Sequence, residues 1–101
     1  MKYQLGDSFL ADYFRLTERE RQLFKEAIHK LNEAFANRTG WPPVWPSSLR
    51  VKALAGHPNL WELTWSFAGP DGRATFEFID VDGEPGIKWR RVGRHDIFRQ
   101  P

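Results

Sequence analysis

Positive charge and a histidine gather near the C-terminal end of the sequence. Residues 86–101 contain one Asp and five Lys or Arg, namely Lys88, Arg90, Arg91, Arg94 and Arg99. His95 stands among them, and imidazole is the side chain that titrates near neutral pH. The whole chain has a net charge of only +2, so the basic residues are unevenly placed. This pattern indicates a polyanionic partner, and the alternative is an ordinary solvated surface.

The sequence offers few candidate metal ligands. The chain has no cysteine, which excludes disulfides and thiolate metal sites and fits a cytoplasmic protein. His29 falls on the polar side of a predicted helix. His57 stands in a predicted turn and could touch substrate, although a simple loop residue is the more ordinary interpretation. The three histidines are too far apart to indicate a metal site. We therefore expect no metal and no cofactor.

Length and composition indicate a single small domain that spans residues 1–101. A chain of 101 residues, of which 41% are hydrophobic, can bury one core. The first residues include an early Asp and no unbroken apolar stretch, so we expect no signal peptide. No window reaches the roughly 20 apolar residues of a membrane span, and we expect no membrane partner.

The first part of the chain has helical patterns that would build one layer of the domain. Residues 2–5 form a possible short strand, and Asp7 or Ser8 can cap a helix that follows. Thr17 and Glu20 have the spacing of a capping box. Apolar residues then recur at helical spacing as far as residue 35, and Asn37 and Gly40 mark the end of the helix. The proline-rich residues 41–46 predict a stiff connector whose two Trp side chains pack over the core, with a proline-recognition ligand as the alternative.

From residue 49 onward the apolar residues alternate with polar ones, which is typical of strands with one buried face. The predicted strands cover residues 49–53, 60–67, 73–78 and 87–90, with turns at 69–72 and 82–86. The predicted class is therefore α+β, with an N-terminal helical hairpin packed on one face of a four-stranded antiparallel sheet.

Two helices can cover only one face of such a sheet, so the polar set must line the other. That set comprises Arg50, Lys52, Glu62, Thr64, Arg73, Thr75, Glu77, Lys88 and Arg90. Its cations occur on three of the four predicted strands, and a basic face of this kind attracts phosphates. We expect it to bind RNA, DNA or an acidic protein segment, and plain cross-strand ion pairs are the alternative.

Three segments carry a resemblance to a known family. Residues 48–56 with 60–63 resemble the LRVKxLxG…xWEL stretch of the RelE/ParE toxin superfamily. Residues 72–77 resemble the strand that begins with that family's catalytic arginine. Residues 91–98 are similar to the RxGxHxxxF ending of its ribonuclease branch, which includes RelE-, YoeB- and YafQ-like toxins. With the helical hairpin before them, the resemblance covers nearly the whole chain in the right order and implies a RelE-like fold.

The resemblance implies the toxin of a type II toxin–antitoxin system. Members of the family typically cleave messenger RNA, usually in the ribosomal A site, and a cognate antitoxin holds them inactive. Their chemistry needs no metal, because the ribose 2′-OH attacks the adjacent phosphorus and leaves a 2′,3′-cyclic phosphate and a 5′-OH. Such a site must deprotonate the 2′-OH, neutralise the phosphate and protonate the leaving oxygen.

Carried over by position, three residues take these roles. Arg73 would clamp the phosphate, and His95 would be the general acid, with a structural histidine as the alternative. Lys52 stands where relatives place a general base or a basic stabiliser. If Lys52 stays charged, Glu62 or Glu77 is the substitute base.

Six further residues are expected to bind RNA: Arg50, Lys88, Arg90, Arg91, Arg94 and Phe98. Phe98 would stack on a base or anchor the tail. Arg91 matches another arginine of the family, but strict alternation puts it on the buried side with Trp89, so a bend near Gly93 would have to release it.

The sequence also departs from the family pattern. Thr64 stands where many relatives have an arginine, and Phe98 stands where they have a tyrosine. These departures put catalytic strength in doubt, so a second hypothesis remains. It is a binding protein on the same fold that cuts nothing, either a ParE-like gyrase inhibitor or a degenerate antitoxin-binding subunit.

Overall fold

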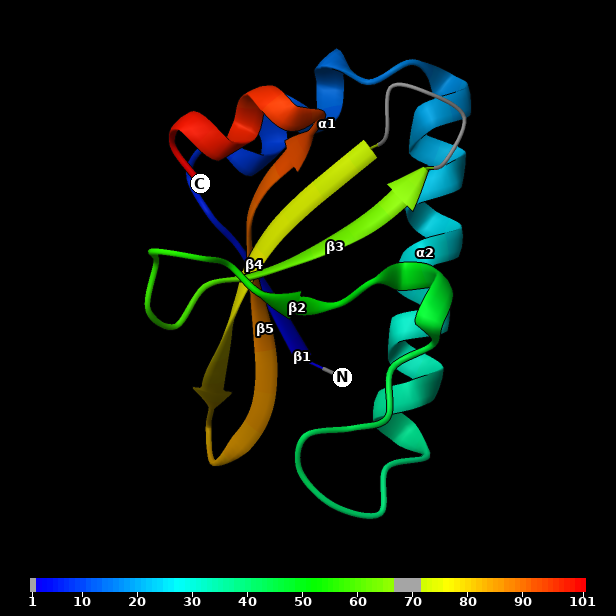
Figure 1. The fold of residues 1–101 in the computed structure, drawn as a ribbon, viewed down its shortest axis with the longest axis vertical. Coiled ribbons are helices and arrows are strands. Elements are labelled where there is room, and N and C mark those ends of the chain that lie inside the picture. Colours follow the sequence, from blue (N-terminus) through cyan, green and yellow to red (C-terminus); the bar gives the residue numbers. More distant parts are fainter. Residues whose placement is uncertain (1, 67–71) are drawn as a thin grey trace.

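The computed structural model describes residues 2–66 and 72–101. Its elements are β1 (Lys2–Leu5), α1 (Phe9–Arg15), α2 (Glu18–Ala36), the 3₁₀ helix η1 (Ser47–Leu49), β2 (Lys52–Ala53), β3 (Trp61–Ser66), β4 (Gly72–Val81), β5 (Glu84–Gly93) and the 3₁₀ helix η2 (His95–Arg99). Figure 1 shows α2 running along one side of a strongly twisted sheet. Two helices that precede four of the five strands and pack on the sheet confirm the predicted α+β class.

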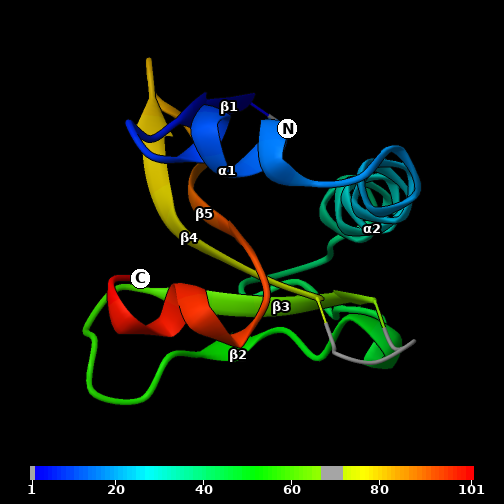
Figure 2. The ribbon, with the colours of Figure 1, turned by 90° about the horizontal axis from the view of Figure 1, so that it is seen from above.

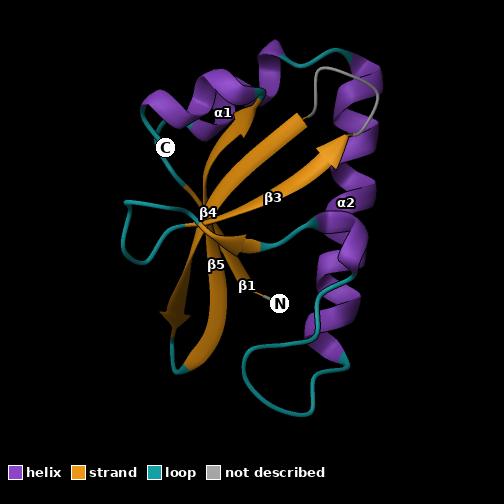
Figure 3. Ribbon diagram, in the orientation of Figure 1, coloured by secondary structure: helices purple, strands orange, loops and turns teal. Residues whose placement is uncertain are grey.

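The sheet has five strands in the order β1-β5-β4-β3-β2 (Figure 3). β1 pairs with β5 in parallel, whereas the other three pairings are antiparallel. The prediction of four antiparallel strands was wrong on this point. A parallel neighbour needs a long connection, and both helices and three strands separate β1 from β5 along the chain.

The capping box fixes the start of α2, as predicted. The Thr17 hydroxyl accepts a hydrogen bond from the Glu20 backbone N–H at 3.1 Å, and the Glu20 carboxylate accepts one from the Thr17 N–H at 2.9 Å. The buried side of the helix then carries Phe24, Ala27, Leu31 and Phe35. Because this stripe must face the sheet, the cap also sets where the helix lies.

Aromatic side chains make up much of the core between α2 and the sheet. The Phe24 ring is fully buried and lies 5.4 Å from the Trp89 ring and 6.2 Å from the Trp65 ring. Burial of a side chain of this size contributes roughly 1.5–3 kcal/mol. Leu10 and Phe14 of α1, by contrast, are 48% and 68% exposed.

Among the helices of the described residues, none is long and apolar enough to cross a membrane.

The strand predicted at residues 49–53 is mostly absent. Leu49 ends η1, and Arg50 has a left-handed backbone with φ 48°, so only Lys52 and Ala53 pair with β3. The proline-rich connector has no regular structure, as predicted. Its Trp45 packs against the core, and the Trp41 ring contacts the Phe35 and Phe78 rings, with centroids 6.2 and 5.0 Å away, although Trp41 is 55% exposed. The turn predicted at 69–72 lies almost entirely outside the described residues.

The β4–β5 hairpin contains an irregularity that matters for the site. Its turn is a tight one in which both Asp82 and Gly83 have positive φ, as a two-residue hairpin turn requires. Further along, Phe76 pairs with Trp89 while Thr75 pairs with Arg91, so Arg90 is an extra residue in β5. Such a β-bulge reverses the side to which the following residues point.

Candidate active site and nucleic-acid interface

Cross-strand pairing places the predicted catalytic residues of the sheet on one face. Lys52 pairs with Glu62 and Glu62 pairs with Thr75, while Arg73 pairs with Thr64 on one side and Gly93 on the other. The alternate residues of β3 and β4, among them Leu63 and Phe76, are buried in the core. We call the face that carries Lys52, Glu62, Arg73 and Thr75 the outer face. Neighbours along and across strands on one face lie within about 5–8 Å of each other.

The backbone of Arg73 is held by Trp65. The indole N–H of Trp65 donates a hydrogen bond to the Arg73 carbonyl at 2.8 Å. The preceding Gly72 lies against the same ring, and a Cβ there would come within 2.3 Å of the Trp65 side chain. Only glycine therefore fits this close approach, which fixes where the Arg73 side chain leaves the strand.

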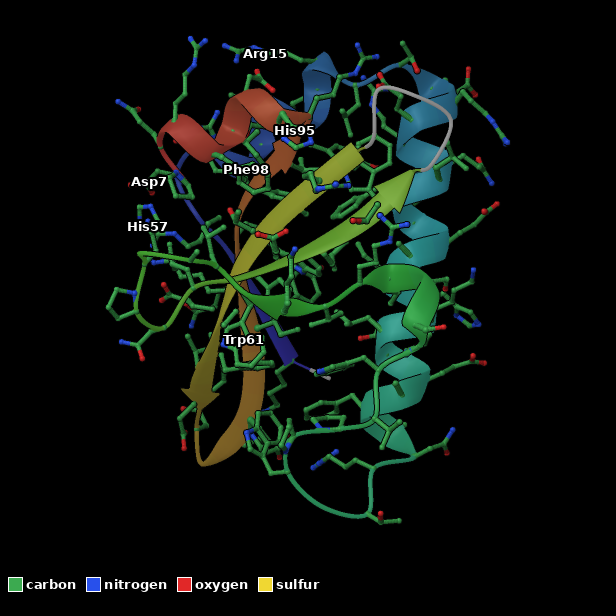
Figure 4. All side chains as sticks on the ribbon, in the orientation of Figure 1. Asp7, Arg15, His57, Trp61, His95 and Phe98 are labelled. Carbon is green, nitrogen blue, oxygen red and sulfur yellow. The ribbon has the colours of Figure 1, made fainter. Side chains whose placement is uncertain are left out.

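The pairing of Arg73 with Gly93 brings the C-terminal helix to the arginine. His95 follows Gly93 by two residues and opens η2. The His95 ring is exposed and contacts the Phe98 ring edge to face, with 5.5 Å between their centroids. Figure 4 shows both rings beside η2, at the end of the sheet where β4 begins. The structure thus brings His95 and Phe98 to the same end of the outer face as Arg73.

The C-terminal segment covers part of the outer face, which the sequence did not predict. The Thr75 hydroxyl donates to the Pro101 carbonyl at 3.0 Å, and Ile97 packs on Gly93. Thr75 is consequently buried, and Thr64 on the neighbouring strand β3 is buried as well. Figure 2 shows α1 and η2 on opposite sides of the molecule. The expectation of a fully open basic face was wrong at these positions.

The three candidates for the general base all lie in ion pairs on the outer face. The Lys52 ammonium lies 3.8 Å from the Glu62 carboxylate, and Lys52 is exposed whereas Glu62 is nearly buried. Glu77 pairs with Arg90 at 3.2 Å. Glu62 is the carboxylate whose partner on β4, Thr75, is two residues from Arg73. Glu62 is therefore closer to Arg73 in register than Glu77, which lies four residues from Arg73 along β4.

Two of the predicted RNA-binding arginines bind helices instead. The Arg91 guanidinium donates to the Asp12 carboxylate from Nε at 2.5 Å and Nη2 at 3.0 Å, and to the Gln100 carbonyl from Nη1. The hydrogen bond to Asp12 raises the pKa of Arg91. Arg94 donates to Glu20 at 3.0 Å. The bulge at Arg90, rather than a bend at Gly93, takes Arg91 out of the core-facing alternation.

The other predicted RNA-binding residues lie in two places. Arg50 is exposed just before β2. Lys88 and Arg90 line a cleft of about 520 Å³ together with Arg99 and His57. Sequence reasoning assigned no role to Arg99 and treated His57 as a loop residue, because only the folded chain shows that these two meet. Among the residues described, no group of three or more His, Cys, Asp or Glu side chains could hold a metal ion.

Comparisons with known proteins identify the fold. No family model matches the chain, and no curated protein matches it by sequence. Three solved structures resemble it over nearly its whole length. A chain of the RelB–RelE antitoxin–toxin complex from Methanococcus jannaschii is 16% identical with a TM-score of 0.58, over 95% of this chain and 94% of that one.

The other two structures agree. A mutant of the E. coli toxin RelE in the free state is 15% identical with a TM-score of 0.58, over 97% of this chain and 90% of that one. The YoeB/ParE toxin from Agrobacterium tumefaciens is 17% identical with a TM-score of 0.55, over 94% and 99%. The predicted resemblance is confirmed at the level of architecture: this chain has the fold of the RelE/ParE toxin superfamily.

Proposed function

We propose that this chain is the toxin of a type II toxin–antitoxin system and cleaves messenger RNA in the ribosomal A site, in the cytoplasm. The proposal is supported by the toxin fold of its structural neighbours. It is supported further by strand register, which puts Arg73 on the same face as the Lys52–Glu62 ion pair and next to Gly93, two residues before His95. Such a set can perform RNA transesterification with side chains of the protein.

The observation that carries the proposal is the register of Arg73 with Gly93, which sets His95 two residues beyond the neighbour of the arginine. The guanidinium of Arg73 neutralises the charge that develops on the phosphate and donates two parallel hydrogen bonds to its oxygens. His95 is exposed and can approach the leaving oxygen. We propose that one phosphodiester contacts both side chains.

The reaction forms a bond from O2′ to phosphorus and breaks the bond from phosphorus to O5′. A base takes the proton of the 2′-OH, and His95 gives a proton to O5′, which leaves as a 5′-hydroxyl. The Lys52–Glu62 pair supplies the base, with Glu77 as the alternative. The products are a 2′,3′-cyclic phosphate and a 5′-OH end. No metal, cofactor or redox partner enters this scheme.

A cognate antitoxin is part of the same proposal. The Methanococcus jannaschii neighbour comes from a complex of RelE with RelB. The outer face and the C-terminal segment display exposed cations, among them Lys52 and Arg99. An antitoxin segment with acidic and apolar residues would cover these cations and close the site to RNA.

The test uses purified protein and ribosomes programmed with a defined message. Primer extension should reveal wild-type cuts at the A-site codon, because the ribosome presents the strand to the site. His95→Gln should reduce cutting by two to four orders of magnitude, since roughly that factor comes from a general acid. His29→Gln on the exposed side of α2 is the matched control and should cut like wild type. An intact message, or full activity of His95→Gln, would refute the proposal.

A second candidate is a member of this fold that binds without cutting. It is favoured by the burial of Thr75 under the C-terminal segment, which leaves less of the outer face open to RNA. A gyrase supercoiling assay separates the two candidates. Inhibition of supercoiling by wild-type protein and by His95→Gln alike, with messages left intact, would establish the binding role.

A further inference from the structure

A basic cleft lies beside the proposed active site and has no role in the cleavage chemistry. It encloses about 520 Å³ between the loop before β3, which supplies His57, the end of η2, which supplies Arg99, and β5, which supplies Lys88 and Arg90. Asp7, just before α1, is the carboxylate in its lining. Figure 4 shows His57 and Asp7 on the same side of the molecule, below the C-terminal helix.

The cations of the cleft differ in how they are neutralised. Arg90 is held by Glu77 and by the Pro101 carbonyl. Lys88 and Arg99, in contrast, form no ion pair with any of the residues that the structure describes. A concave surface with uncompensated positive charge concentrates anions, because low-dielectric walls focus its field. Lys88 and Arg99 are therefore the two side chains that are placed to meet an anion entering the cleft.

The position of the cleft fits the course of an RNA strand. Lys88 pairs with Glu77 on β4, four residues along the strand from Arg73. At about 3.3 Å per residue, the two positions are roughly 13 Å apart. A strand whose scissile phosphate sits at Arg73 can reach the cleft with another of its phosphates by passing over the C-terminal segment, whose Pro101 carbonyl is bonded to Thr75 between the two positions. Arg90 lies on this path, with its Nε and one Nη already oriented by protein acceptors.

The cleft combines cations with an exposed aromatic ring. His57 is exposed at the rim, and an imidazole ring can stack on an unpaired base. Cationic grooves with interleaved aromatic rings are typical of single-stranded nucleic-acid binding, since every base has a face on which to stack. An acidic peptide would gain no binding energy from stacking on the His57 ring. The observations therefore favour RNA over an acidic protein segment as the occupant.

We propose that this cleft is a second phosphate-binding subsite, in which Lys88 and Arg99 bind a phosphodiester of single-stranded RNA and His57 stacks on an adjoining base. The inference rests on the proposed function, because it takes the occupant to be the strand that is cut at Arg73. It assigns Lys88, Arg99 and His57 to holding the strand, and none of them to the bond-breaking step.

The test measures binding apart from cleavage. The probe is a fluorescent single-stranded oligoribonucleotide with 2′-O-methyl groups throughout, which cannot be cut at any ribose. Fluorescence anisotropy should give at least a roughly tenfold weaker affinity for the double variant Lys88→Ala/Arg99→Ala, the loss expected for about 1.4 kcal/mol of binding. The slope of log affinity against log salt should also decrease by about 0.7 for each phosphate that the variant no longer neutralises.

A matched control has the same loss of charge elsewhere. Arg19→Ala/Lys30→Ala removes two exposed cations from α2, outside the cleft, and should bind the probe nearly as wild type does. Arg99→Glu alone should also weaken binding, and because Arg99 is exposed this variant should fold normally. Thermal melting of each variant checks that it has folded.

The outcomes separate the subsite from the proposed function. Equal binding by the Lys88/Arg99 and Arg19/Lys30 variants would overturn the subsite, even if wild type cuts ribosomal messages. Failure of wild type to bind the probe would overturn it as well, as would preference for a polyglutamate peptide over RNA. Binding that depends on Lys88 and Arg99, with no cleavage of unmodified messages, would support the subsite and refute the nuclease.

Discussion

Asp12 of α1 and Arg91 of β5 form a two-point ion pair across 79 residues of sequence. The Asp12 carboxylate also accepts a hydrogen bond from the Val92 backbone N–H at 3.3 Å, and its side chain is almost fully buried. These interactions hold α1 against β5, the strand that leads into the C-terminal helix η2. Arg91 is thereby engaged in holding the fold, and this ion pair is the reason we leave it out of the proposed RNA interface.

The first prediction concerns this ion pair. Replacing Asp12 with Ala should lower the free energy of unfolding by about 3–5 kcal/mol, because Arg91 loses its partner in a largely buried place. Arg91→Met should be similarly harmful, since it strands a buried carboxylate. Urea unfolding measures both effects. If Arg91→Met instead left stability unchanged and abolished RNA binding, Arg91 would belong to the interface.

The second prediction concerns pH and the start of α2. The Thr17 backbone N–H and the Arg94 guanidinium both donate to Glu20 and lower the pKa of its carboxyl group below its ordinary value. The ionised carboxylate therefore adds stability that is complete above the unfolded-state pKa and disappears as the pH falls through the folded-state pKa.

Glu20→Gln should accordingly make stability less dependent on pH in the acid range. At neutral pH it should cost less than the ~1 kcal/mol typical of losing a cap, because Gln can still accept from Thr17. Glu26→Gln, an exposed position on the same helix, is the control. Unfolding curves across the acid range decide the matter, and identical pH profiles for the two variants would contradict the assignment.

The third prediction concerns the support of Arg73. In Gly72→Ala the new Cβ would lie 2.3 Å from the Trp65 ring, which donates to the Arg73 carbonyl. The ring must move, at a cost of about 1–3 kcal/mol, and the arginine moves with it. We expect both the melting temperature and RNA cleavage to decrease. Gly40→Ala has open space around its Cβ and should change neither.

Local patterns predicted the elements of this fold well. The capping box of Thr17 and Glu20 and the alternation of Leu63 and Trp65 each follow from neighbours in sequence. The short strand at residues 2–5 was predicted as a possibility, but its parallel pairing was not, because its partner, β5, begins about eighty residues later. The left-handed backbone at Arg50 was equally hidden, since alternation alone fits a strand there.

The candidate site was harder to predict than the fold. The two-residue period of side chains along a strand is enough to predict that Lys52 and Arg73 lie on one face of the sheet. The engagement of Arg91 with Asp12 depends on a bulge at Arg90, and a bulge leaves no signature in the residue types around it. His57 and Arg99 line one cleft only because of how the loop before β3 and the helix η2 pack on the sheet. Arrangements of this kind are set by tertiary packing.

The fourth prediction concerns the base. Because Lys52 and Glu62 form one pair, Lys52→Met and Glu62→Gln should each lower cleavage by about 100-fold or more. The double variant should be little worse than the poorer single one, as is typical of residues that act as a unit. Single-turnover cleavage rates test this. A larger loss in Glu77→Gln would identify Glu77 as the base instead.

The most direct test of the mechanism is the chemistry of the cut ends. Mass spectrometry of messages cleaved on the ribosome should find a 2′,3′-cyclic phosphate on one fragment and a 5′-hydroxyl on the other. A single 2′-deoxy nucleotide at the cut site should prevent cleavage, and Arg73→Lys should slow it by roughly 10²–10³-fold. Ends with a 5′-phosphate, or cleavage that survives the 2′-deoxy substitution, would contradict transesterification at Arg73 and His95.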